Sequence, residues 1–156
     1  MRTLHLIPDP VRGCDNPMQV VSRALRYFSA HGSDPLPIPD LAQALDISED
    51  CLEYSFDRIR GMTTAQALQL HRLNRLFAVL SAEPRQTLDQ AIRRCGLGQT
   101  RGVVPLFEQT FGIEMALFLL TCRRAAEDRL FRREHRDSQS LVLSGPGPGP
   151  SPGPGS

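Results

Sequence analysis

The sequence predicts an all-α protein of about seven helices, in which a long linker helix joins two helix-turn-helix subdomains. Apolar residues recur every three to four positions over much of the chain, as they do on the buried face of a helix. Asn, Ser or Thr precedes several of these stretches, and Gly or Pro follows them; both are helix boundary signals. A short helix, a turn and a longer helix ending in glycine then occur twice.

The first predicted helix begins at Asn16-Pro17, because Asn caps free N–H groups and Pro suits the first helical position. It ends near His31-Gly32. Residues 1–16 contain Pro and Gly without apolar periodicity, so we expect a flexible N-terminal arm. Residues 33–39 hold three Pro and should be extended.

The first helix-turn-helix is predicted from Asp40 onward. A short helix covers Asp40–Leu45, and a tight turn follows at Asp46-Ile47. Ser48 caps a second helix that runs to about Arg60, where Gly61 ends it.

The longest periodic run is the linker helix, which Thr63 caps and Glu83-Pro84 stops. Its apolar stripe consists of Leu68, Leu73, Leu76, Phe77 and Leu80. The first helix-turn-helix subdomain and the linker therefore span residues 17–82.

The same pattern returns after the linker. A short helix from Thr87 to Arg94, a turn at Cys95–Leu97 and a further helix to Thr110 precede Gly112. A last helix is expected over about 113–134, so the second subdomain spans residues 83–136. Residues 137–156, which end in GPGPGPSPGPGS, should form a disordered Gly/Pro tail.

Bulk charge argues mildly against a nucleic-acid-binding domain, which is usually basic. All 18 basic residues are Arg, and they balance 17 acidic residues to a net charge of +1. The distribution is uneven, however. Residues 38–61 hold six acids against two Arg, whereas residues 72–133 hold eleven Arg against six acids.

Composition and spacing also limit the class of function. The cysteines Cys14, Cys51, Cys95 and Cys122 are isolated, which favours buried free thiols in a reducing cytoplasm. The four His are scattered, and no nucleophile elbow, phosphate-cradling loop or metal-ligand spacing occurs. We therefore expect no enzyme, no metal and no cofactor. Without a signal sequence or membrane-spanning stretch, the sequence predicts a cytoplasmic protein with no membrane partner.

On periodicity alone, the repeated unit fits two structures equally well. One is a helix-turn-helix, in which the first helix braces the second against the DNA major groove. The other is a generic helical bundle with short loops.

The residues of the first unit resemble the DNA-binding domain of AraC/XylS-family transcription regulators. The segment from Leu41 to Leu80 reads LAQALDISEDCLEYSFDRIRGMTTAQALQLHRLNRLFAVL. Its matching anchors are L-A at 41–42, I-S at 47–48, L-x-x-x-F at 52–56, G-M-T at 61–63 and R-L-N-R at 72–75. The upstream stretch 24–42 resembles the family's first helix and entry loop. The second unit matches more loosely, through C-G-L at 95–97 and F-x-x-x-F-G at 107–112, so that the resemblance covers about residues 20–122.

The resemblance implies a sequence-specific DNA-binding transcription regulator whose two recognition helices enter successive major grooves. Double-stranded DNA would be its partner, and RNA polymerase is a further candidate. Because only sixteen residues precede the first predicted helix, we expect no separate small-molecule effector domain.

The family's site residues can be carried over by position. The base-facing residues would be Asp50, Glu53 and Tyr54 in the first recognition helix, and Gln99, Thr100 and Arg101 in the second. The phosphate contacts would be Arg58, Arg60, Arg72, Arg75, Arg93, Arg94, Arg123 and Arg124.

Two features depart from the family pattern. The first recognition helix carries carboxylates where relatives have amide, aromatic or basic groups. In the second unit, Gly102 and Pro105 predict a recognition helix that begins late, at Val103 or Val104, and leaves Arg101 in a loop. The alternative function is therefore a degenerate helix-turn-helix module that acts through protein–protein interaction with little DNA binding.

Overall fold

The structure, a computed structural model, describes residues 16–144, and every regular element in that range is a helix. This confirms the predicted all-α fold of about seven helices. The elements are α1 (Pro17–His31), α2 (Ile38–Ala44), α3 (Glu49–Arg60), α4 (Thr64–Ala82), α5 (Leu88–Arg94), α6 (Thr100–Phe111) and α7 (Met115–Ser144). The flexible arm predicted for residues 1–16 and the Gly/Pro end of the predicted tail lie, apart from Asn16, outside the described residues.

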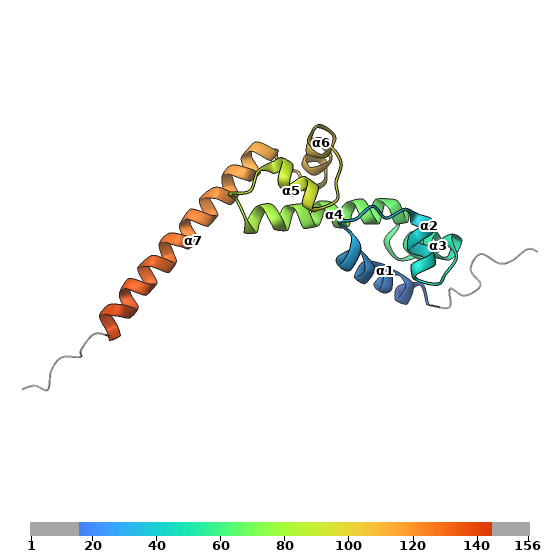
Figure 1. Ribbon diagram of the computed structural model, residues 1–156, viewed down its shortest axis with the longest axis horizontal. Coiled ribbons are helices and arrows are strands. Elements are labelled where there is room, and N and C mark those ends of the chain that lie inside the picture. The colour runs from blue at the N-terminus through green and yellow to red at the C-terminus, as the bar shows by residue number, and fades with distance from the viewer. Residues whose placement is uncertain (1–15, 145–156) are drawn as a thin grey trace, which may run out of the picture.

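Two hydrophobic cores lie along the molecule, and α4 contributes to both (Figure 1). The first joins α1, α2, α3 and the start of α4 around Phe28, Leu52 and Phe56, none of which is exposed. The second joins the end of α4 with α5, α6 and the start of α7 around Leu76 and Phe107. Each fully buried Phe or Leu contributes roughly 1.5–3 kcal/mol, so each unit is held by its own core.

Side-chain caps start four of the helices at the residues that the sequence indicates. Asn16 Oδ1 accepts from Gln19 N, and Ser48 Oγ accepts from Cys51 N at 3.0 Å. Thr63 and Thr87 each form a reciprocal capping box with the Gln three positions later.

The two helix-turn-helix units repeat closely in length. Both first helices have seven residues, and both second helices have twelve. Gly61 and Gly112 end α3 and α6 in the left-handed conformation, with φ of 66° and 67°. A residue of α3 therefore corresponds to the residue 51 positions later in α6.

The prediction that the second recognition helix begins late is wrong. α6 begins at Thr100, contains Arg101 and continues through Pro105. Pro105 removes one main-chain hydrogen bond, at a cost of about 3 kcal/mol in a helix interior. The first turn is nevertheless closed, because Gln99 O accepts from Gly102 N and Val103 N at 3.0 and 3.1 Å. Burial of Val103 and Phe107 in the second core offsets the loss.

Three predicted boundaries also shift. α2 begins at Ile38, inside the stretch predicted to be extended, because Pro39 fits the first turn of a helix. α7 begins at Met115 and continues to Ser144, so residues 137–144 belong to a helix and not to a disordered tail. No Pro or Gly interrupts the chain between Gly112 and Gly145, which explains why this helix does not stop earlier.

The cysteines within residues 16–144 are of two kinds, and the prediction for Cys14 lies outside the described residues. Cys95 and Cys122 are buried free thiols, as predicted. Cys51 is disulfide-bonded, so the prediction of a free thiol there is wrong. Isolated spacing in the sequence does not exclude a disulfide, because bonding depends on the distance in space.

Within residues 16–144 no single helix is long and apolar enough to cross a membrane. Only α6 taken together with Met115–Ser138, at a bend of 75°, reaches the length and composition of a span.

Candidate nucleic-acid interface

The outer faces of α3 and α6, the second helices of the two units, carry different charges. On α3, Asp50 and Tyr54 are exposed; the corresponding positions on α6 are Arg101 and Pro105, which are also exposed. A carboxylate would lie near DNA phosphates at the first position, and a guanidinium at the second. The second helix therefore presents the more favourable charge.

Glu53 does not belong to this outer face, contrary to the base-facing prediction. Its side chain is half-buried, and Oε2 accepts from the main-chain N of Thr64 at 3.3 Å. A carboxylate at this place accepts a hydrogen bond from one otherwise free N–H at the start of α4. Its negative charge also interacts favourably with the positive N-terminal end of the α4 dipole. Glu53 thus ties α3 to the linker helix.

The second unit has an analogous tie from a different position. Glu108 Oε2 accepts from Met115 N at 2.9 Å, at the start of α7. Sequence reasoning missed both contacts, because each joins the recognition helix to the helix that follows it. In both units a carboxylate on the recognition helix therefore fixes the next helix.

Among the base-facing residues predicted in the second unit, Thr100 is already engaged. Its hydroxyl donates to the Asp89 carboxylate of α5, which joins the two helices of the unit. Gln99, at the N-terminal cap of α6, and Arg101 remain exposed. The structure thus leaves Gln99 and Arg101 as the polar side chains that can reach outward from this end of α6.

Two of the predicted phosphate contacts are bound within the protein. Arg94 Nη1 donates to Glu83 Oε2 at 2.9 Å and to Gln86 Oε1 at 3.0 Å. Arg72, on α4, donates from Nε to Gly32 O at 2.7 Å and from Nη2 to Asp34 O at 2.8 Å. The other members of the predicted set are all exposed: Arg58, Arg60, Arg75, Arg93, Arg123 and Arg124.

Arg72 takes part in a contact between the two units. The carbonyl oxygens of Gly32 and Ser33 lie so close to Gly96, in the turn between α5 and α6, that a Cβ there would meet them at 3.0 and 2.7 Å. Gly96 also has a φ of 73°, which a side chain would disfavour. The loop after α1 is thus held by Arg72 on one side and covered by the second unit on the other.

His71, next to Arg72, packs against the first core. Its ring centroid lies 5.7 Å from that of Phe28. Burial lowers the pKa of His71 below its ordinary value of about 6.5, and the neighbouring charges of Arg75 and Arg72 lower it further, against a hydrogen bond to Phe28 that raises it. The neutral imidazole is therefore the favoured form in the folded protein.

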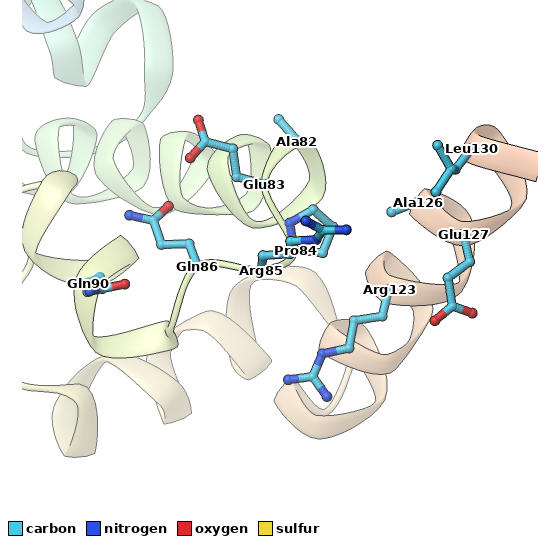
Figure 2. A pocket seen from close by; sticks show the side chains of 10 residues that line it. All are labelled: Ala82, Glu83, Pro84, Arg85, Gln86, Gln90, Arg123, Ala126, Glu127 and Leu130. Atoms are coloured by element: carbon cyan, nitrogen blue, oxygen red, sulfur yellow. The ribbon is translucent and has the colours of Figure 1, made fainter. Parts of the chain in front are cut away.

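An open groove of about 930 Å³ lies between α7 and the loop that joins α4 to α5 (Figure 2). Arg85 lines it from the loop, and Arg123 and Leu130 line it from α7. Arg123, predicted as a phosphate contact, thus lies in this groove. Over residues 16–144, no three His, Cys, Asp or Glu side chains gather closely enough to hold a metal ion.

Comparison with known proteins gives a structural likeness. No protein-family model matches the sequence, and no curated protein matches it. Among solved structures, the chain is similar to the C-terminal domain of AraT, a response regulator from Geobacillus stearothermophilus, with a TM-score of 0.58 and 19% sequence identity. The match covers 65% of this chain and 84% of that one. At this identity the likeness establishes a shared fold.

Proposed function

We propose that this protein is a sequence-specific DNA-binding transcription regulator of the AraC/XylS type. The observation that carries the proposal is the repeat: two units of equal helix length present the outer faces of α3 and α6 from the two ends of one continuous helix, α4. A double-headed arrangement of this kind suits two successive major grooves. The fold shared with the C-terminal domain of a response regulator supports the same reading.

The second unit would supply most of the attraction to DNA. Arg101 and Arg93 are exposed in α6 and α5, and Gln99 lies at the start of α6. Arg is suited to guanine or phosphate, and Gln to adenine. The first unit would contribute Tyr54, together with Arg58 and Arg60 near the end of α3.

A salt titration of binding to a labelled DNA duplex tests the proposal. We expect the affinity of the wild-type chain to fall as salt rises, because bound cations are released from the phosphates. Arg101→Ala should weaken binding about tenfold and flatten the salt slope by about 1 if it contacts a phosphate. Arg26→Ala, which removes the same charge from an exposed position on α1, is the matched control. Absence of binding at low salt would contradict DNA binding, and equal losses in the two variants would contradict a contact between α6 and DNA.

The acidic face of α3 favours a second candidate, a helix-turn-helix module that binds a basic protein. Asp50 and Asp57 are both exposed there. If α3 lies in a DNA groove, the Asp50→Asn/Asp57→Asn variant should bind a random duplex more tightly than the wild type, because two repulsive charges are gone. If α3 binds a protein, the same variant should lose affinity for an immobilised Arg-rich peptide, and the wild type should bind DNA poorly. Glu53 is left intact in this test, because its carboxylate caps α4.

A further inference from the structure

α7 has two faces of different character. Met115, Phe118 and Cys122 are buried in the second core. On the opposite face, residues follow one another at intervals of three and four positions, and all are exposed: Leu117, Leu120, Arg124, Glu127 and Phe131. This second set is the outer face of α7.

The outer face exposes large apolar side chains. Leu117 is 54% exposed, Leu120 is 50% exposed and Phe131 is 68% exposed. α7 also continues well beyond the rest of the molecule (Figure 1), and residues 127–138 are exposed throughout. Within the part of the chain that the structure describes, no other element covers this face, although its apolar area favours burial.

The charges between the apolar residues indicate what covers it. We propose that a second copy of this chain packs on the outer face, with the two α7 helices antiparallel around a twofold axis that crosses between positions 125 and 126. In that register Leu120 lies opposite Phe131 of the second copy, and Arg124 lies opposite Glu127 of the second copy. The symmetry repeats each contact, so two apolar pairs flank two opposite-charge pairs. Leu117 lies at the end of the contact, opposite Glu134 of the second copy.

The same residues disfavour the parallel arrangement. With parallel helices in register, Arg124 would lie opposite Arg124, and Glu127 opposite Glu127. Like charges at facing positions repel each other. The pattern of charge therefore selects one orientation of a helix pair as well as its register.

The size of the face sets the strength of the contact. Eighteen residues, 117–134, extend over about 27 Å of helix. A helix pair of this length is smaller than a standard interface of about 800 Å² per partner. The dimer therefore forms and dissociates with concentration. Arg124, in this arrangement, serves the second copy and not a DNA phosphate.

Sedimentation of the full-length chain without DNA, over a range of concentrations, tests the inference. The wild type should pass from monomer to dimer. Arg124→Glu and Glu127→Arg should each lose the dimer, because either change puts like charges opposite each other twice. The double variant Arg124→Glu/Glu127→Arg should regain it. A wild type that stays monomeric, or singles that dimerise as well as the wild type, would overturn the proposal.

Mixing the two single variants shows whether residues 124 and 127 pair between two chains or within one helix. In the mixed dimer each Glu faces an Arg of the other chain, so an equimolar mixture should dimerise where neither variant does alone. A mixture that stays monomeric contradicts the register. These outcomes do not depend on whether the protein binds DNA.

The apolar contact has its own matched pair of variants. Phe131→Ser should abolish the dimer, whereas Leu130→Ser should keep it, because Leu130 lies about 100° around α7 from Phe131, toward the groove. Glu127 lies at the edge of the outer face, where it is exposed and also lines the groove. Circular dichroism of both variants checks that the helices remain folded. Loss of the dimer in Leu130→Ser but not in Phe131→Ser would place the interface on another face and contradict the proposal.

Discussion

Arg72 donates a hydrogen bond of 2.7 Å from Nε to the main-chain oxygen of Gly32, across 40 positions of sequence. Its Nη2 donates a second bond to Asp34 O, so one guanidinium closes the loop that leaves α1. That loop is the surface on which the Gly96 turn rests. The relative position of α3 and α6 therefore depends in part on Arg72, a residue of α4.

Arg72→Ala should lower the free energy of unfolding by about 2 kcal/mol, because hydrogen bonds from a charged donor contribute roughly 1.5–3 kcal/mol. Urea unfolding followed by circular dichroism measures the change. Arg75→Ala, which removes an exposed guanidinium one turn along α4, should change stability by less than about 0.5 kcal/mol. Similar losses in both variants would mean that the loop contact contributes little.

Gly96→Ala should destabilise the protein more than Gly112→Ala does. Both glycines are left-handed, with φ of 73° and 67°, so both substitutions carry a backbone strain of about 1–2 kcal/mol. Only at Gly96 would the new methyl group meet carbonyl atoms, since nothing lies within 4 Å of a Cβ at Gly112. Thermal unfolding of the two variants gives the comparison, and equal melting temperatures would argue against the contact between the units.

Two substitutions in α6 should stabilise the protein. Pro105→Ala restores a hydrogen bond to the carbonyl of Arg101 and should add up to about 3 kcal/mol. Gly102→Ala should add about 1 kcal/mol, because a Cβ at this exposed helical position meets no atom within 4 Å. Denaturant midpoints report both effects. Gly61→Ala is the control of opposite sign, since its φ of 66° makes Ala unfavourable there.

Stability should fall below about pH 6.5 in a way that depends on His71. Burial and two Arg neighbours hold the pKa of His71 in the folded state below its ordinary value of about 6.5. The unfolded chain then binds the proton first as pH falls, so unfolding is favoured from about pH 6.5 down to the folded-state pKa, where the loss levels off. Above pH 6.5 the full stability is present.

The Phe variant of His71 checks the sign of this effect. His71→Phe keeps an aromatic ring against Phe28 but cannot be protonated, so its unfolding free energy should vary less between pH 5 and 7 than that of the wild type. Identical slopes in the wild type and His71→Phe would exclude His71 as the cause.

The sequence predicted the helix boundaries that a nearby capping residue or glycine determines. Ser48, Thr63 and Thr87 cap helices through atoms three positions away, and Gly61 ends α3 through its own backbone freedom. The start of α6 was not accessible in this way. Gly102 and Pro105 both have low helix propensity. The helix forms nevertheless, because Phe107 is buried against residues of the second core that are distant in sequence.

The sequence did not predict which side chains of the candidate site are already engaged within the protein. The family resemblance, carried over by position, puts Arg72 and Arg94 among the phosphate contacts and Glu53 among the base-facing residues. The structure binds them to Gly32 O, Glu83 and Thr64 N, which lie 40, 11 and 11 positions away. Such partners depend on tertiary geometry, which periodicity does not encode. Asp50, Tyr54 and Arg101 are exposed, as an outward-facing role requires.

Because α4 is continuous, it fixes the distance and the rotation between the two units. Leu68 belongs to the first core and Leu73 to the second, so less than two turns of helix separate the two points of attachment. One residue inserted between them would turn the second unit by about 100° and advance it by about 1.5 Å. The number of residues between Leu68 and Leu73 thus sets both the distance and the rotation between the two units. A change in that number would alter the spacing and the relative orientation of any pair of sites that the two units occupy together.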